Sequence, residues 1–137
     1  MRAAWNLNDQ GMLGLVGIRI GGRVVPHVGL GAYADATPAF SPITPKCGGC
    51  EGPERPLRAG GYLDLHTLPN RVVDPWFRFA LGFLRTARSS ADAEFDFGLD
   101  FRHRRVAGGP FVMWVVPLGE EQPKKWVGFG AQLSLTF

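Results

Sequence analysis

Long apolar runs and helical patterning are both missing from this sequence of 137 residues. Its longest apolar run, 111–118, is far shorter than the ~18 residues that a membrane-spanning helix needs, and Pro117 interrupts it. No window has the 3.6-residue repeat of an amphipathic helix. These absences exclude a helical membrane protein and indicate a chain built from strands.

The N-terminus lacks the charged segment, apolar segment and small-residue cleavage site of a signal peptide. That absence counts against export. If the protein is exported, we expect that the start codon is assigned too late, or that the sequence is mature or truncated. A strand-like stretch directly after Met1 fits that expectation.

Charge is modest and scattered, with a formal net charge of +3 and one dense basic run at 102–105. No nucleic-acid-binding module accompanies this run, so we expect no nucleic-acid partner. Apolar residues make up 45% of the chain and charged residues 20%, which excludes a disordered chain. The length and even composition predict a single domain over residues 1–137.

Glycine and phenylalanine are plentiful instead, at 19 and 10 residues, and they fall in stretches of period-two alternation. The clearest stretch alternates without a break from Trp126 to Phe137. The fold class is therefore all-β, and we predict a closed antiparallel up-and-down barrel of about eight strands. The expected strands lie within 2–7, 16–20, 24–32, 62–66, 77–84, 94–102, 111–118 and 126–137.

The expected connections alternate in length along the chain. Gly21-Gly22 predicts a two-residue hairpin, which leaves Pro26 inside a strand and predicts a bulge beside it. Short connections near 67–74 and 105–109 share that end of the barrel, and the other end has the long loop 36–56. Longer outer loops and short periplasmic turns are typical of outer-membrane barrels.

The face opposite the apolar residues decides which side of the wall is outside. It consists of small residues and a few charges, which suits the crowded lumen of a narrow barrel better than a water-facing surface. The apolar face carries no charge on the clear strands, as a lipid-facing band requires. Aromatic residues at strand ends form either interface girdles or ordinary packing; they are Trp5, Tyr33, Trp76, Trp114 and Trp126. The expected lumen charge network is Arg19, Asp64, Arg78, Glu94, Asp96, Asp100 and Arg102.

Residues 126–137 resemble the terminal strand of bacterial outer-membrane β-barrels, with alternating apolar residues before a final aromatic residue. That resemblance implies an assembly signal read by the barrel-assembly machinery at Leu133, Leu135 and Phe137. The stretch 19–33, a strand, a glycine turn and a second strand, resembles the early hairpin of small eight-stranded surface barrels of the OmpA-like and OmpW-like type.

Cysteine and histidine give few candidates for chemistry. Cys47 and Cys50 flank two glycines in the long loop, without the strand-to-helix setting of a redox motif. A metal site would need both thiolates and histidines from separate strands or turns. We expect a local disulfide and no metal. His27, His66 and His103 form no evident triad, and we expect His66, on the face of Asp64, to make a lumen hydrogen bond.

The sequence thus predicts a non-enzymatic, monomeric outer-membrane barrel with a side-chain-filled lumen, no cofactor, and membrane lipid and the assembly machinery as partners. The alternative is a soluble calycin-like barrel, cytoplasmic or periplasmic, that binds a small apolar ligand. A lipid-modifying barrel enzyme ranks below both. The directions of Phe77, Phe79, Phe95 and Phe97 distinguish the first two hypotheses.

Overall fold

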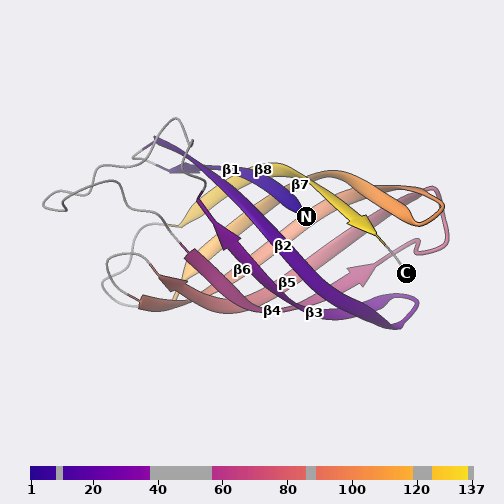
Figure 1. Cartoon of the computed structure of the whole chain (residues 1–137), viewed down its shortest axis with the longest axis horizontal. Coiled ribbons are helices and arrows are strands. Elements are labelled where there is room, and N and C mark those ends of the chain that lie inside the picture. Colours follow the sequence, from indigo (N-terminus) through magenta and orange to yellow (C-terminus); the bar gives the residue numbers. More distant parts are fainter. Residues whose placement is uncertain (9–10, 38–56, 86–88, 119–124, 136–137) are drawn as a thin grey trace, which may run out of the picture.

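The computed structural model describes residues 1–8, 11–37, 57–85, 89–118 and 125–135, and no side chain at 6–8, 11–13 or 126. These residues form eight antiparallel strands in sequence order, and β8 pairs with β1 to close a barrel. Figure 1 shows the strands winding round the long axis. The strands are β1 (Arg2–Asn8), β2 (Gly11–Val25), β3 (Val28–Ala36), β4 (Leu57–His66), β5 (Val73–Arg85), β6 (Ser89–His103), β7 (Val106–Pro117) and β8 (Trp126–Leu135).

The all-β closed barrel confirms the predicted fold class. Three short connections, β2–β3, β4–β5 and β6–β7, lie together at the right of Figure 1, and we call this the turn end. The opposite end is the loop end. Among the described residues there is no helix long and apolar enough to cross a membrane.

The first hairpin differs from its prediction. The strand β2 continues through Gly21 and Gly22, and the two-residue turn consists of Pro26 and His27, with a register shift between Arg23 and Val25. The placement of Pro26 within a strand was therefore wrong as well. A side chain at Gly21 would collide with the Tyr62 hydroxyl, so this glycine makes room inside the barrel rather than a turn.

Most of the large apolar side chains on the strands point outward. Phe77, Phe79, Phe95 and Phe97 are 50%, 38%, 47% and 47% exposed. They stack across strands in pairs, Phe77 on Phe97 with ring centroids 4.9 Å apart and Phe79 on Phe95 at 5.2 Å. The outward direction predicted for the four phenylalanines is confirmed.

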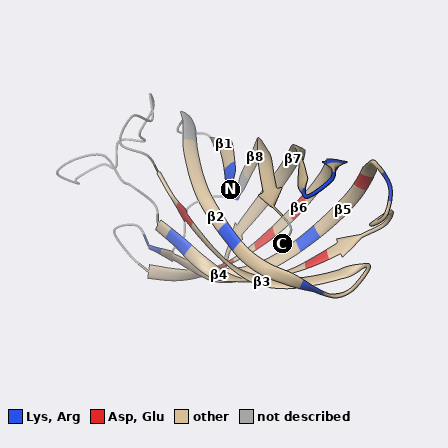
Figure 2. Ribbon diagram, turned by 45° about the vertical axis from the view of Figure 1, so that its right-hand side comes forward, with Lys and Arg blue, Asp and Glu red and all other residues tan. Residues whose placement is uncertain are grey.

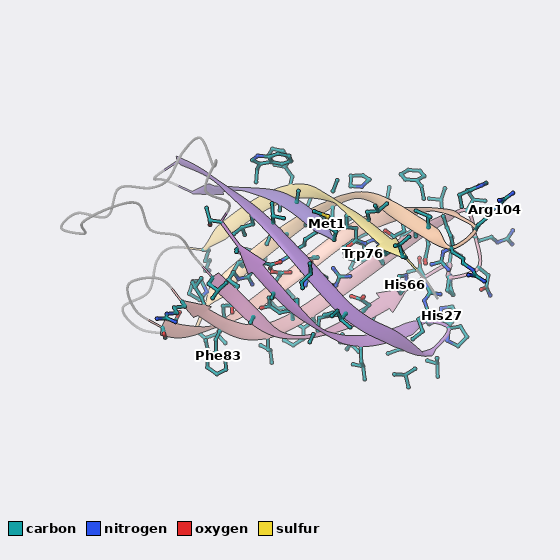
Figure 3. The ribbon with its side chains drawn as sticks, viewed as in Figure 1. Met1, His27, His66, Trp76, Phe83 and Arg104 are labelled. Atoms are coloured by element: carbon teal, nitrogen blue, oxygen red, sulfur yellow. The ribbon has the colours of Figure 1, made fainter. Side chains whose placement is uncertain are left out.

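The girdle interpretation is wrong for two of the five aromatic residues. Tyr33 and Trp76 are buried and point into the lumen, and Figure 3 shows Trp76 inside the wall while Phe83 projects from it. Trp5 and Trp114 are exposed on the outer surface. Both buried residues lie at inward positions of their strands, and this parity outweighs their nearness to a strand end. The side chain of Trp126 lies outside the described part.

Candidate functional site: the charged interior of the barrel

The centre of the barrel is crossed by a buried network of arginines and carboxylates. Figure 2 shows where charged residues lie along the strands. Glu94 on β6 has no exposed side-chain area and lies at its middle. Arg19 on β2 donates to it at 2.7 Å, and β2 and β6 are diametrically opposite, four strands apart in either direction. The network therefore spans the lumen. We call it the central charge cluster, and it consists of Arg2, Arg19, Arg58, Asp35, Asp92, Glu94 and Asp96.

Three arginines share the Glu94 carboxylate. Arg2 donates to its two oxygens at 2.7 and 3.1 Å, and Arg58 donates at 2.6 Å. Arg2 also donates to Asp35, and Arg58 also donates to Asp92. Buried guanidinium groups are tolerated only where such bonds replace their hydration, so each carboxylate stabilises the charges around it.

The predicted network residues all line the interior, but they do not form one network. In the central charge cluster, Arg19 lies 3.6 Å from Asp96 as well as bonding to Glu94. Arg78 bonds to Asp64, with one contact of 3.0 Å, and lies 3.6 Å from Asp96. Nearer the turn end, Asp100 accepts a 2.9 Å bond from Gln132.

A second group lies at the turn end around Asp74, which is fully buried. His66 Nδ1 lies 2.8 Å from Asp74 Oδ2, and Arg102 Nη2 lies 3.4 Å from the same oxygen. The lumen hydrogen bond expected for His66 is present, but its partner is Asp74 rather than the Asp64 that shares its strand. Arg23 is the last member of this group, and its Nη2 lies 3.5 Å from Asp74 Oδ2. We call Arg23, His66, Asp74 and Arg102 the turn-end cluster.

Sequence reasoning missed six members of these clusters: Arg2, Arg23, Asp35, Arg58, Asp74 and Asp92. A signal was present for Arg58 and Asp92, since each continues the period-two face of a predicted lumen residue, Asp64 on β4 and Glu94 on β6. Arg2 and Asp35 could be found the same way once the strand faces are fixed. Asp74 lies within a stretch that was expected to be a connection, which hid it.

Apolar side chains fill other parts of the lumen. Trp76 packs on Phe111 with ring centroids 6.3 Å apart, and Arg78 lies 4.7 Å from the centre of the Trp76 ring. The remaining space forms a cavity of about 750 Å³ toward the turn end, between Arg19, Tyr62, Arg78, Asp100 and Arg102. The predicted filling of the lumen by side chains therefore holds only in part. The buried apolar cluster is Ala4, Leu15, Trp76, Leu84, Phe111, Met113 and Val115.

At Gly98 on β6 the lumen leaves no room for a side chain. A Cβ at this position would lie 2.6 Å from Trp76 Cε2 and 2.9 Å from Phe111 Cβ, both well inside van der Waals contact. We expect Gly98→Ala to lower the free energy of unfolding by ~1–3 kcal/mol, because the two rings must shift. The midpoint of urea unfolding measures this loss.

The control for this experiment is Gly61→Ala on the outer face of β4. There a Cβ meets only the Gly31 carbonyl oxygen, at 3.6 Å. Equal midpoints for the two alanine variants would contradict tight packing at Gly98.

Several predicted features lie outside the described residues. They are Cys47 and Cys50 with their expected disulfide, and Phe137 of the expected assembly signal. Leu133 and Leu135 of that signal are exposed on the outer face of β8. No group of three or more His, Cys, Asp or Glu side chains in the described part is arranged to hold a metal ion.

Comparison with known proteins assigns no family. No protein-family model matches the chain, and no curated protein matches it in sequence. The fold and the distribution of side chains over the two faces of the wall therefore carry the functional argument.

Proposed function

We propose that this chain is a bacterial outer-membrane β-barrel protein that spans the bilayer and anchors its loops at the cell surface, without catalytic activity. The outward face of the barrel carries the proposal. On the described strands its positions are occupied by apolar and small residues except at two strand ends, where Arg85 closes β5 and His103 closes β6.

Such an apolar surface is unfavourable in water. Soluble proteins rarely expose apolar patches of more than a few hundred Å², because these patches cause association. Here exposed phenylalanine, leucine, isoleucine or valine side chains occur on every strand from β2 to β8. Hydrocarbon accepts these side chains, and it also requires the closed hydrogen bonding that a barrel provides. Membrane lipid is then the main partner of the protein.

The inner face supports the same proposal and disfavours the soluble alternative. A calycin-like barrel that holds a small apolar ligand needs an apolar pocket with few polar groups. The cavity in this barrel has apolar lining residues, but it is also lined by five arginines and two aspartates, more charge than such a ligand favours. The buried charges pair with one another across the lumen. In a transmembrane barrel the outer face makes no polar contacts, so these inner pairs would fix the shape of the wall.

The non-catalytic assignment rests on the surroundings of His66. Asp74 orients its ring, as in a general-base pair, but in the described part no serine, threonine or cysteine side chain hydrogen-bonds to it. A lipid-modifying enzyme needs such a nucleophile or an activated water. We therefore place the function in the loops, propose a monomer without a cofactor, and propose that the outward Leu133 and Leu135 of β8 contribute to recognition by the assembly machinery.

Tryptophan fluorescence provides the experiment. Trp114 is 47% exposed on the outer face, whereas Trp76 is fully buried in the lumen. After refolding into phosphatidylcholine vesicles with brominated acyl chains, we expect strong quenching of the wild-type chain. Bromine in the bilayer reaches Trp114 and not Trp76. Trp114→Phe should therefore remove quenchable fluorescence, while Trp76→Phe removes only fluorescence that bromine leaves unquenched.

Flotation of the vesicles is measured on the same samples. A chain that stays in the aqueous fraction with unquenched tryptophan contradicts the membrane proposal and favours the soluble alternative. Quenching that Trp76→Phe reduces and Trp114→Phe does not would mean that the barrel wall is turned inside out in lipid.

A further inference from the structure

The turn end of the barrel carries three exposed arginines without side-chain partners in the described part of the chain. Arg71 lies in the β4–β5 connection, and Arg104 and Arg105 form the β6–β7 turn. Figure 3 shows Arg104 at the tip of this end, and Figure 2 shows the same turn in blue. We call these residues the arginine rim. Their guanidinium groups are free to bind an anion from outside.

Acidic residues at the same end do not neutralise the rim. Asp64, Asp74 and Asp100 are the described acids nearest to the turns in sequence, and their exposed fractions are 8%, 0% and 4%. All three are engaged inside the lumen, Asp64 by Arg78, Asp74 by the turn-end cluster and Asp100 by Gln132. The described surface of this end is therefore positive.

The two turns of the rim are held together by hydrogen bonds. Arg102 donates from its Nη1 to the Pro69 carbonyl at 2.8 Å and from its backbone N–H to the Val72 carbonyl at 2.7 Å. These bonds attach the β4–β5 connection to β6, next to the β6–β7 turn. The arginines of the rim thus project from one rigid base, which lowers the entropy cost of binding a ligand with several of them.

Apolar side chains lie directly beside the rim on the outer face. Val72 is 71% exposed, Phe101 53% and Val106 42%. Along the wall, the surface changes from apolar side chains to arginines within one or two residues, at Val72 beside Arg71 and at Val106 beside Arg105. A bilayer changes in the same way, from acyl chains to phosphate groups, over a few ångströms.

We propose that the arginine rim binds the phosphate groups of anionic phospholipids in the leaflet at the turn end. Guanidinium groups bind phosphate oxygens with two parallel hydrogen bonds, and each cation near a membrane surface adds attraction to anionic lipid. This inference rests on the proposed membrane insertion and adds a lipid preference to it. The barrel then carries a shell of anionic lipid at this end.

Spin-labelled lipids test the preference. The folded chain is placed in phosphatidylcholine bilayers containing spin-labelled phosphatidylglycerol or spin-labelled phosphatidylcholine, and the protein-bound fraction of each label is measured. We expect a preference of the wild-type chain for phosphatidylglycerol well above the roughly fivefold that one cation at a membrane surface supplies. In Arg71→Gln/Arg105→Gln, which keeps only Arg104 of the rim, the preference should fall to about fivefold or less, whereas the charge-retaining Arg71→Lys/Arg105→Lys keeps most of it.

The matched control removes two cations from the loop end, in Arg85→Gln/Lys125→Gln. This variant has the same net charge as the glutamine variant of the rim and should keep the preference. Equal loss in both variants would mean that net charge attracts the lipid, and would overturn the proposal. Displacement by inorganic phosphate, but not by chloride at equal ionic strength, would overturn it in favour of a site for free phosphate.

Flotation separates the two proposals. A chain that does not float with the vesicles overturns membrane insertion and the lipid preference together. A chain that floats, with its outward tryptophan quenched, and binds both labels equally overturns the lipid preference alone.

Discussion

Glu94→Gln is expected to lower the free energy of unfolding by about 3–5 kcal/mol, the usual cost of removing one partner from a buried ion pair. The carboxylate has no exposed area and accepts hydrogen bonds from Arg2, Arg19 and Arg58. Glutamine keeps the size but loses the charge, so three guanidinium groups in the lumen must share the remaining aspartates. The loss should appear as a lower urea midpoint with an unchanged slope for the chain folded in vesicles.

Asp100→Asn is the matched control for this prediction. Its carboxylate is also buried, but among the described residues only the neutral Gln132 amide donates to it. Asparagine can still accept that bond, so we expect a loss of about 1 kcal/mol or less. If the two variants unfold at the same urea concentration, Glu94 is not the shared counter-ion of the cluster.

A double variant separates charge from packing. Removing Arg19 together with Glu94, as Arg19→Met/Glu94→Gln, takes away one of the guanidinium groups that the first substitution leaves unpaired. We expect this pair to be more stable than the sum of the two single losses predicts, because the two residues are coupled. Strict additivity would contradict direct interaction across the lumen.

Phe79→Arg is expected to have the second largest effect. Phe79 lies at the middle of β5, points outward and stacks on Phe95. If the wall faces hydrocarbon, a guanidinium at this depth costs ~2–4 kcal/mol. Folding yield in vesicles should fall and the urea midpoint should decrease. In a barrel surrounded by water, the same substitution would leave the stability almost unchanged, so the measurement also tests the proposed function.

Phe101→Arg provides the depth control. Phe101 is also exposed on the outer face, but it lies close to the end of β6 beside the turn end. There an arginine can reach the phosphate groups, and the cost falls to ~0–1 kcal/mol. Equal effects at positions 79 and 101 would argue against a bilayer around the strands.

The two faces of the wall have different tolerances, and this follows from what surrounds each of them. In the proposed membrane setting, the lipid chains outside adapt to any apolar shape, so size matters little there and charge is costly. Inside, charge is accepted where a partner is present, and volume is limiting, as at Gly98 beside Trp76. Conservative substitutions should therefore be judged by face, with polarity decisive outside and size decisive inside.

The sequence alone was sufficient for the class of fold and for the direction of its side chains. Alternation of period two sends neighbouring residues to opposite faces. The face that carries Phe77, Phe79, Phe95 and Phe97 has no charged residue within the predicted strands, and this was enough to predict that the four side chains point outward. The chain order of the strands and the two ends of the barrel followed from the lengths of the connections. Both are local properties, which a sequence records directly.

Only the tertiary structure decided which charges meet and where the first hairpin turns. Arg2 and Glu94 are 92 residues apart, and their contact depends on barrel closure and on the register of every strand between them. Gly21 and Gly22 match a turn pattern, but β2 continues through both, and Tyr62, from another strand, occupies the space that a side chain at Gly21 would need. The parity of β5 turns Trp76 inward, but its ring fits in the lumen only because Gly98 on the neighbouring strand leaves room for it. These contacts join residues that are far apart in the sequence, and no local pattern records them.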